Sequence, residues 1–300
     1  MELFERDFSK YEPAIKERAL QAFKDDLGCG DITTEAVFNG AGEDRASRAV
    51  ITAEQDCVLA GVLEARAIFE DGGLEVIGKK DGDMVKKGKT VLTISGSVKE
   101  LLARERVALN YLSRMSGIAT VSRRLADQYG KKVLFLRKTD PGLLFSEKRA
   151  VALGGCLPHR MNLSDGILIK DNHINELAKG GTRLDAMKMA IIRADEFRSG
   201  QAQMPIEIEV ETVEEARFAA EELRDLQGPN IIMLDNMRPQ DVKRASNMVK
   251  SVNHEITIEA SGGITEENIK DYLDAGADFV STSMFLSAKN CGFSMEMGTK

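Results

Sequence analysis

Short apolar segments alternate with longer stretches of helical character throughout the second half of this chain. Six of the segments have the composition of buried strands: 133–136, 167–169, 206–210, 231–234, 256–260 and 279–281. Alternation of this kind predicts βα repeats around a parallel sheet or barrel. The span 116–283 is shorter than the roughly 200 to 250 residues of an ordinary eightfold barrel, so we expect a reduced barrel.

The first third of the chain has a different texture, which predicts a separate α+β domain. A helical segment over residues 14–27 is opened by Pro13 and closed by a Gly-Cys-Gly sequence, and extended stretches follow it. A long helix with one apolar side is predicted from about residue 99 to residue 116. We expect an N-terminal α/β domain over residues 1–115 and a barrel domain over residues 116–283. The C-terminal segment 284–300 is expected to pack on the first domain.

Composition and charge exclude several classes of protein. The formal net charge is −7, which argues against nucleic acid as a general partner because such binding depends on cationic side chains. No run of about 18 apolar residues is present, and the first residues lack the basic and apolar regions of a secretion signal, so we expect neither a membrane partner nor export. The four cysteines never form a closely spaced pair, which favours reduced thiols and a cytoplasmic location.

Charged or phosphate-compatible residues follow nearly every predicted strand. In chain order these are Arg137 with Lys138, Lys170, Glu209, Asp235, and Ser261-Gly262-Gly263. Because the active sites of barrels lie at the C-terminal ends of the strands, these side chains are expected to converge on one mouth. Any one of them alone could be an ordinary solvated charge, but the whole set favours a functional site.

The cations of this set suit a ligand with several negative charges. Arg137, Lys138, Arg160 and Lys170 are accompanied by His159. Arginine binds carboxylates and phosphates through two parallel hydrogen bonds, whereas lysine acts as a compact point charge. The sequence therefore predicts a binding site for a polyanionic ligand.

The carboxylates of Glu209 and Asp235 would be poor additions to a site for anions alone. They can hold Mg²⁺, which prefers carboxylates, water and substrate oxygens. Anionic ligands together with Mg²⁺ point to phosphoryl or pyrophosphate chemistry. The predicted phosphate-binding elements are the Ser261-Gly262-Gly263 turn, which opens a helix late in the barrel, and the polar residues Ser281 and Ser283.

Seven motifs in the chain occur together in one known family. They are Gly30-Asp31-Ile32-Thr33-Thr34, the segment 105–120, Arg137-Lys138-Thr139, His159-Arg160, Ile169-Lys170-Asp171-Asn172-His173, Leu234-Asp235-Asn236 and Glu259-Ala260-Ser261-Gly262-Gly263-Ile264. Their order and rough spacing are those of quinolinate phosphoribosyltransferases, which the sequence resembles from about residue 25 to residue 285.

The resemblance implies an N-terminal α/β sandwich and an incomplete, open barrel of about seven strands. It implies a homodimer, or a larger assembly built on it, in which the first domain of one subunit covers the other's barrel mouth, so that Arg106 would enter the partner's site. The residues it places around the two carboxylates of quinolinate are Arg106, Arg137, His159, Arg160 and Lys170.

The activity implied by the resemblance is a carboxylating pentosyl transfer in NAD biosynthesis. Quinolinate and phosphoribosyl pyrophosphate (PRPP) would give nicotinate mononucleotide, pyrophosphate and CO₂. The resemblance assigns catalytic roles to Lys138, Glu209 and Asp235, and it makes Glu209 and Asp235 the ligands of the Mg²⁺ cofactor that accompanies PRPP.

Three positions depart from the pattern of the family. Leu136 stands in a pair that is usually polar, Leu144 stands where a basic residue is usual, and the loop 281–287 replaces one that normally contains glycine. These departures leave open a different acid substrate, and two further alternatives stand beside it. The first function is that of a related phosphoribosyltransferase for another aromatic or heteroaromatic acid. The others are a Schiff-base lyase or aldolase-type barrel, which would use Lys138 or Lys170 at a strand end, and a non-catalytic pyridine-acid-binding protein.

Overall fold

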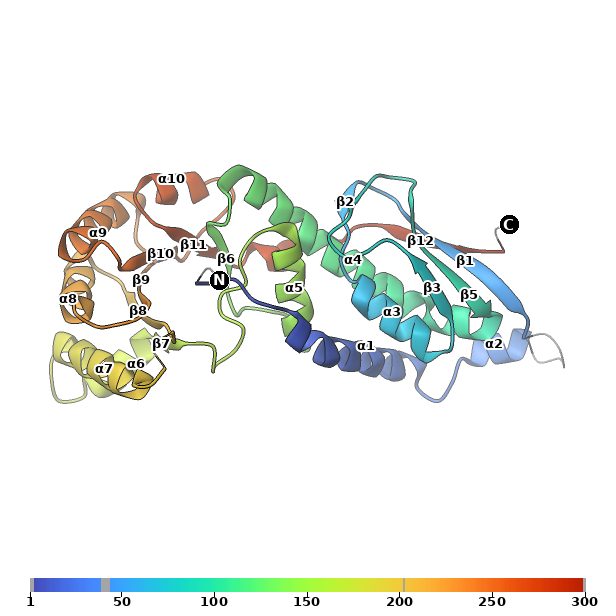
Figure 1. The fold of residues 1–300 in the computed structure, drawn as a ribbon, viewed down its shortest axis with the longest axis horizontal. Coiled ribbons are helices and arrows are strands. Elements are labelled where there is room, and N and C mark those ends of the chain that lie inside the picture. The colour runs from blue at the N-terminus through green and yellow to red at the C-terminus, as the bar shows by residue number, and fades with distance from the viewer. Residues whose placement is uncertain (1–2, 39–43, 202, 299–300) are drawn as a thin grey trace. The chain divides into compact units, whose positions relative to one another are not determined.

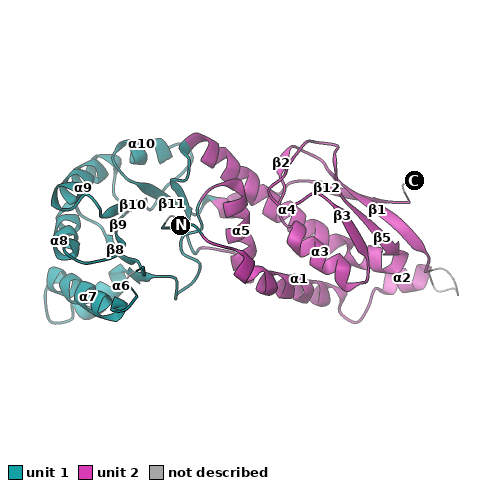
Figure 2. Cartoon of the chain, viewed as in Figure 1, with its two compact units in different colours: residues 1–5, 129–137, 157–284 teal, residues 6–128, 138–156, 285–300 magenta. Residues whose placement is uncertain are grey.

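The computed structural model describes residues 3–38, 44–201 and 203–298, which fold into two compact units (Figure 2). Unit 1 is drawn from residues 1–5, 129–137 and 157–284, and unit 2 from residues 6–128, 138–156 and 285–300. Within the described ranges, no helix combines the length and apolar character that crossing a membrane requires.

Unit 2 is built on an antiparallel sheet of four strands (Figure 1). In spatial order the strands are β12 (Phe293–Met297), β1 (Ala46–Ala53), β5 (Thr90–Ser97) and β3 (Glu75–Gly78). Along the second half of β1, buried residues alternate with partly exposed ones, which is the pattern of a strand with one face on a core. The C-terminal strand β12 pairs with β1, so residues 293–297 belong to this unit.

Short strands and helices complete unit 2. Two strands, β2 (Cys57–Val58) and β4 (Met84–Val85), pair separately from the main sheet. The helical elements are η1 (Ser9–Tyr11), α1 (Glu12–Leu27), α2 (Ile32–Val37), α3 (Val62–Asp71), α4 (Val98–Tyr129) and α5 (Leu144–Gly154).

Helix α4 crosses the domain boundary expected at residue 115. It continues without a break to Tyr129, and no proline interrupts it. Within it, a Cβ atom at Gly117 would collide with the carbonyl oxygen of Lys289, so the glycine permits close passage of the C-terminal segment rather than ending the helix. Residues 116–128 and α5 therefore belong to unit 2, and unit 1 is smaller than the predicted barrel domain.

Unit 1 is built on a parallel sheet of six strands. Its order is β6 (Val133–Phe135), β11 (Phe279–Thr282), β10 (Thr257–Ser261), β9 (Asn230–Asp235), β8 (Ile206–Val210) and β7 (Ile167–Ile169). All six strands predicted from the sequence are present. Instead of a seventh strand, the described residues show a single parallel bridge between Leu134 and Leu157.

Five helices accompany this sheet. They are α6 (Asp171–Leu177), α7 (Arg183–Arg198), α8 (Val213–Leu223), α9 (Pro239–Val252) and α10 (Ile269–Asp274), and the 3-10 helix η2 (Met284–Ser287) begins after β11. Helices α7, α8 and α10 contact the strands, and Figure 1 shows the helices along the outside of the sheet. Parallel strands with crossover helices confirm the predicted open α/β architecture.

One face of the parallel sheet is apolar near the N-terminal ends of the strands and charged near their C-terminal ends. At the N-terminal end, Phe4 packs with Leu134, Leu157 and Ile231 in a buried apolar cluster. Glu207 and Glu209 point to the same face of β8, because residues two apart in a strand share a face. In the strand register, Glu209 and Glu259 both lie opposite Met233 of β9, and Glu207 lies one level nearer the N-terminal ends. The charged mouth therefore lies at the C-terminal ends, above an apolar base.

Candidate active site

The best-defined contact at the mouth of unit 1 joins two neighbouring strands. Lys170 directly follows β7, and its Nζ donates to Oε1 of Glu209 on β8 at 2.6 Å. The Lys170 side chain is 45% exposed and that of Glu209 is 13% exposed, so the ammonium reaches solvent while the carboxylate lies deeper. The backbone N–H of Lys170 donates to Nδ1 of His173 at 2.9 Å, which fixes the start of α6.

Asp235 occupies the equivalent end of the next strand, β9. Its Oδ2 accepts from Nδ2 of Asn236 at 2.6 Å, and its register partner on β10 is Ser261. Asn236 has a φ of +55°, the left-handed conformation that asparagine tolerates better than most residues. Its backbone N–H donates to the Ser261 carbonyl at 2.9 Å, which joins the two strand ends.

The glycine turn after β10 lies against this asparagine. Gly262 has a φ of +86°, and a Cβ atom there would lie 2.8 Å from the backbone nitrogen of Asn236. Gly263 also has a positive φ, of +63°, and is exposed. Only glycine fits the first position, so the bend carries no side chain. The turn does not open a helix directly, as the sequence had suggested, because α10 begins only at Ile269.

Arg160 is the most enclosed cation of the site. It is 9% exposed, and its Nη1 donates to the carbonyl of Gly166 at 2.9 Å. Burial lowers the pKa of Arg160, and the positive charge of Arg137 lowers it further. The guanidinium remains charged, so a carboxylate ligand would relieve the repulsion between the two arginines.

His159 lies below the mouth in a group of buried ionisable side chains. Its Nε2 is 2.8 Å from Oε2 of Glu207 on β8 and 3.8 Å from Oε2 of Glu259 on β10. The three residues are 4%, 2% and 0% exposed. Phe4 covers the imidazole, with ring centroids 4.5 Å apart. His159 is thus a buried member of the cluster rather than an open ligand of the mouth.

Burial dominates the titration of the two glutamates in this cluster. It raises the pKa of Glu207 to about 8, and the charge of Glu209 adds to the shift. It likewise raises the pKa of Glu259 to about 8, where the charge of Glu207 acts in the same direction and His159 opposes it. Among the described residues, His159, Glu207 and Glu259 are also the one group of three whose spacing would allow them to hold a metal ion.

The remaining predicted residues divide between exposed and buried positions. Arg137 and Ser283 are exposed in unit 1, whereas Ser281 is 1% exposed and belongs to the interior of β11. Arg106, on α4, and Lys138 belong to unit 2, where both are exposed. The parallel sheet of unit 1 therefore brings together Arg137, Arg160, Lys170, Glu209, Asp235 and the 261–263 turn.

Glu207 and Glu259 were not anticipated from the sequence as members of the site. A signal for Glu207 was present, because a strand buried on both faces should be nearly all apolar, yet Ile206-Glu207-Ile208-Glu209-Val210 alternates. Alternate residues share a face, so the two glutamates of β8 had to point into the same interior. Glu259 likewise stands between Ile258 and Ala260 in a predicted buried strand, which indicated that its side chain lies in the interior.

Glu209 and Asp235 are candidate ligands for a magnesium ion by the chemistry of their side chains. They offer carboxylate oxygens from adjacent parallel strands, the donor type that Mg²⁺ prefers. Two protein carboxylates leave the remaining coordination positions to water and substrate oxygens. The pairing of Glu209 with Lys170 engages one of its oxygens, which still leaves this residue a second donor atom.

The fold and mouth define an open α/β-barrel protein with cations and carboxylates gathered at the ends of its strands. Residues 31–116 match the family model described as quinolinate phosphoribosyl transferase, N-terminal domain, and residues 118–296 match the corresponding C-terminal domain. The chain therefore belongs to the quinolinate phosphoribosyltransferase family.

Curated relatives cover nearly the whole chain. A probable nicotinate-nucleotide pyrophosphorylase [carboxylating] from Bacillus subtilis (strain 168) is 36% identical over 282 residues, which span 92% of this chain and 90% of that protein. The chloroplastic nicotinate-nucleotide pyrophosphorylase [carboxylating] of Arabidopsis thaliana is also 36% identical, over 93% of this chain and 81% of its own length.

Solved structures show the same fold. The nicotinate-nucleotide pyrophosphorylase from Francisella tularensis is 26% identical and aligns with a TM-score of 0.82 over 99% of both chains. NadC from Streptococcus pyogenes is 33% identical, with a TM-score of 0.80 over 98% of this chain and 99% of that one.

Proposed function

We propose that the chain is a carboxylating quinolinate phosphoribosyltransferase that converts quinolinate and PRPP to nicotinate mononucleotide, pyrophosphate and CO₂ in NAD biosynthesis. The observation that carries this proposal is the pairing of cations with carboxylates at adjacent strand ends, above all Lys170 with Glu209 beside Asp235. An anion-binding half and a metal-binding half at one mouth are what this reaction needs. Membership of the family and the names of its relatives support the same reaction.

The cations would bind the two carboxylates of quinolinate. Arg160 and Arg137 act as the clamps, and Lys170 adds a point charge from the neighbouring strand. Arg106 would complete this set from the partner subunit of a homodimer. His159 would act from below the mouth, since its imidazole is held by Glu207.

The two carboxylates and the glycine turn would serve PRPP. Glu209 and Asp235 would hold Mg²⁺, which supplies neutralisation of the charge that develops on the departing pyrophosphate. The 261–263 turn would bind a phosphate group through its backbone, and the exposed hydroxyl of Ser283 could donate to it. Lys138 would lie near the ribose and the pyrophosphate.

The chemistry needs no covalent intermediate on the protein. The pyridine nitrogen forms a bond to C1 of the ribose as the bond from C1 to the pyrophosphate oxygen breaks. Holding the ring in line with this bond can contribute up to about 7 to 11 kcal/mol in favourable cases. The ring nitrogen is then cationic, so the neighbouring carboxylate leaves as CO₂, and a proton from water replaces it on the ring carbon.

A second candidate is the same transfer to a different aromatic acid. Leu144, in the first turn of α5, stands where the family resemblance predicts a basic residue, and it is partly exposed. A missing cation near the acceptor would weaken the preference for a second carboxylate. A Schiff-base mechanism fits less well, because the Lys170 ammonium is engaged by a carboxylate, whereas that mechanism needs a neutral amine.

One assay tests the proposal directly. The purified protein is incubated with PRPP, Mg²⁺ and quinolinate, and CO₂ and nicotinate mononucleotide are measured, in parallel with nicotinate and other pyridine and benzene carboxylates. Turnover of quinolinate alone supports the proposal, and turnover of another acid alone supports the second candidate. Borohydride trapping of a substrate on a lysine would contradict both. The homodimer and the cytoplasmic location are further parts of this proposal.

A further inference from the structure

The segment that follows Lys138 is held by an ion-pair network in unit 2. Nη2 of Arg114, on α4, donates to Oδ2 of Asp140 at 3.0 Å and to Oε1 of Glu147, on α5, at 2.9 Å. The other carboxylate oxygen of Glu147 accepts the backbone N–H of Asp140 at 3.1 Å. Asp140 is therefore held through both its side chain and its backbone.

Burial makes this network difficult to break. The side chain of Glu147 is fully buried and that of Arg114 is 16% exposed. Burial raises the pKa of Glu147, while the Asp140 N–H and the Arg114 charge act against that shift. A buried carboxylate that loses its cation is strongly destabilised, so Arg114 and Glu147 depend on each other.

Backbone hydrogen bonds continue the network along the connection. The N–H of Leu143 donates to the Asp140 carbonyl at 3.0 Å, and the N–H of Glu147 donates to the Leu143 carbonyl at 2.9 Å. Nη1 of Arg114 also donates to the Ala288 carbonyl at 3.3 Å, which ties the C-terminal segment to the same guanidinium. Lys138 lies two residues before the fixed Asp140 and is itself exposed.

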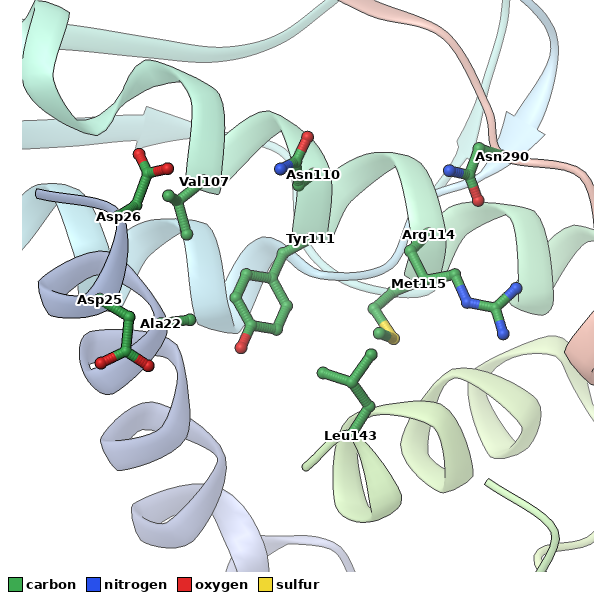
Figure 3. Close-up of a pocket in the computed structure, with 10 residues that line it drawn as sticks. All are labelled: Ala22, Asp25, Asp26, Val107, Asn110, Tyr111, Arg114, Met115, Leu143 and Asn290. Atoms are coloured by element: carbon green, nitrogen blue, oxygen red, sulfur yellow. The ribbon is translucent and has the colours of Figure 1, made fainter. Parts of the chain in front are cut away.

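One end of this connection borders a pocket. Arg114 and Leu143 line a pocket of about 570 Å³ with residues of α1 and α4, including Tyr111 and Met115. Figure 3 shows Leu143 rising from the start of α5 toward Met115, with Arg114 extending from α4 nearby. The hydrogen bonds of the Arg114–Glu147 network thus hold a segment whose end borders open space.

We propose that Arg114 and Glu147 are positioning residues that hold the 138–143 connection and so fix the backbone at Lys138, the residue assigned above to the PRPP step. The inference rests on the proposed function, because it takes the role of Lys138 from there. Neither Arg114 nor Glu147 needs to touch substrate. Their effect reaches the reaction through the backbone from Asp140 to Lys138.

Steady-state kinetics of Arg114→Gln provide the first test. We expect kcat/KM for PRPP to fall by about 10- to 100-fold, as for loss of a charge-assisted hydrogen bond, with KM for quinolinate changed less than twofold. Arg114→Lys should recover part of the loss in kcat/KM, since lysine restores the positive charge but not the several N–H donors of the guanidinium. Arg123→Gln is the matched control, because Arg123 lies on the same helix and pairs only loosely with Asp127, at 4.0 Å. The kcat/KM of Arg123→Gln for PRPP should match that of the unmodified protein.

A double-mutant cycle with Lys138→Ala distinguishes an effect of Arg114 on Lys138 from a general disturbance of the structure. If Arg114 acts through Lys138, adding Arg114→Gln to Lys138→Ala should cost less than a further twofold. If the fold losses in kcat/KM of the two single variants multiply in the double variant, the inference is wrong, while the proposed function stays intact. Full activity of Lys138→Ala would remove the assigned role of Lys138, and the inference with it.

Asp140→Asn provides a variant that should fold even if Arg114→Gln does not. The Asp140 side chain is 52% exposed, and the change keeps the backbone N–H that Glu147 accepts. We expect a 3- to 10-fold loss in kcat/KM for PRPP, roughly the effect of one partly exposed ion pair of about 1 kcal/mol, and no additional loss with Lys138→Ala. An unchanged kcat/KM in Asp140→Asn would count against the inference.

Discussion

The ammonium nitrogen of Lys170 lies 2.6 Å from Oε1 of Glu209, and this contact joins the proposed anion-binding side of the mouth to the proposed metal-binding side. Lys170→Met should therefore lower kcat/KM for quinolinate by about 10- to 100-fold, since a hydrogen bond to a charged group contributes about 1.5 to 3 kcal/mol. Lys179→Met is the control, because Lys179 forms only a surface pair with Glu176. Equal activity of the two variants would contradict the assignment of Lys170.

The proposed magnesium ligands should differ from other acidic residues in their response to the metal. In Glu209→Gln and Asp235→Asn we expect the Mg²⁺ concentration for half-maximal activity to rise by at least about tenfold, because each change removes a charged oxygen donor. The effect is measured by titrating Mg²⁺ at saturating PRPP. Glu211→Gln, an exposed neighbour on the segment after β8, should keep the original requirement. An unchanged requirement in both ligand variants would exclude these residues as the metal site.

The buried pair Glu207 and Glu259 should make the protein less stable as pH rises. In the unfolded chain a glutamate loses its proton near its usual pKa of 4.5, whereas burial holds both folded pKa values at about 8. The folded state thus binds more protons between pH 4.5 and 8, and its free energy of unfolding falls as pH rises through that window, by up to about 1.4 kcal/mol per pH unit for each proton.

Glu259→Gln should flatten this dependence. An uncharged amide has no proton to retain, so the melting temperature of the variant should change less between pH 5 and pH 8 than that of the unmodified protein. Glu255→Gln, at an exposed position, should leave the profile unchanged. A steep profile that persists in Glu259→Gln would mean that other groups cause it.

Gly262→Ala should damage both stability and PRPP binding. Its φ of +86° disfavours any side chain, and the added Cβ would press on the backbone nitrogen of Asn236. We expect a loss of about 1 to 3 kcal/mol in the free energy of unfolding, measured by urea denaturation, and a higher KM for PRPP. Gly181→Ala, where nothing lies within 4 Å and φ is not positive, is the matched control. Equal stability of the two variants would show that the turn has no such constraint.

The proposed shared site of a homodimer predicts complementation. Arg106→Ala and Lys138→Ala should each be nearly inactive, and refolding a mixture of the two should restore partial activity. A heterodimer in which one mouth lacks both residues leaves the other mouth intact, so up to about one quarter of the activity should return in an equal mixture with random pairing. If no activity returns although heterodimers form, Arg106 does not act across subunits.

The architecture could be predicted because it depends on local patterns. Six apolar segments separated by helical stretches indicated a parallel α/β fold, and each became a strand of the sheet. The boundary near residue 115 did not follow, because Ser116 and Gly117 resemble a helix end. In the structure, Gly117 instead lets Lys289 pass close to a continuous helix. That contact is 172 residues distant in sequence, so local patterns could not indicate it.

The candidate site also has a part that local sequence predicted and a part that it could not predict. Residues at strand ends, such as Lys170, Glu209 and Asp235, could be placed at one mouth because the carboxyl ends of parallel strands meet at one edge. The burial of His159 beneath Phe4 could not be predicted, since it depends on where the first residues of the chain pack.

The sequence by itself determined the parallel sheet and the residue types at its strand ends, because periodicity and composition act over a few residues. Only the tertiary structure decided which carboxylates are buried and which connection is braced. Glu207 and Glu259 became neighbours of His159, and Arg114 became the partner of Asp140, through packing between distant segments. Burial and charge pairing are properties of that packing, since the same side chains in an extended chain would all be solvated.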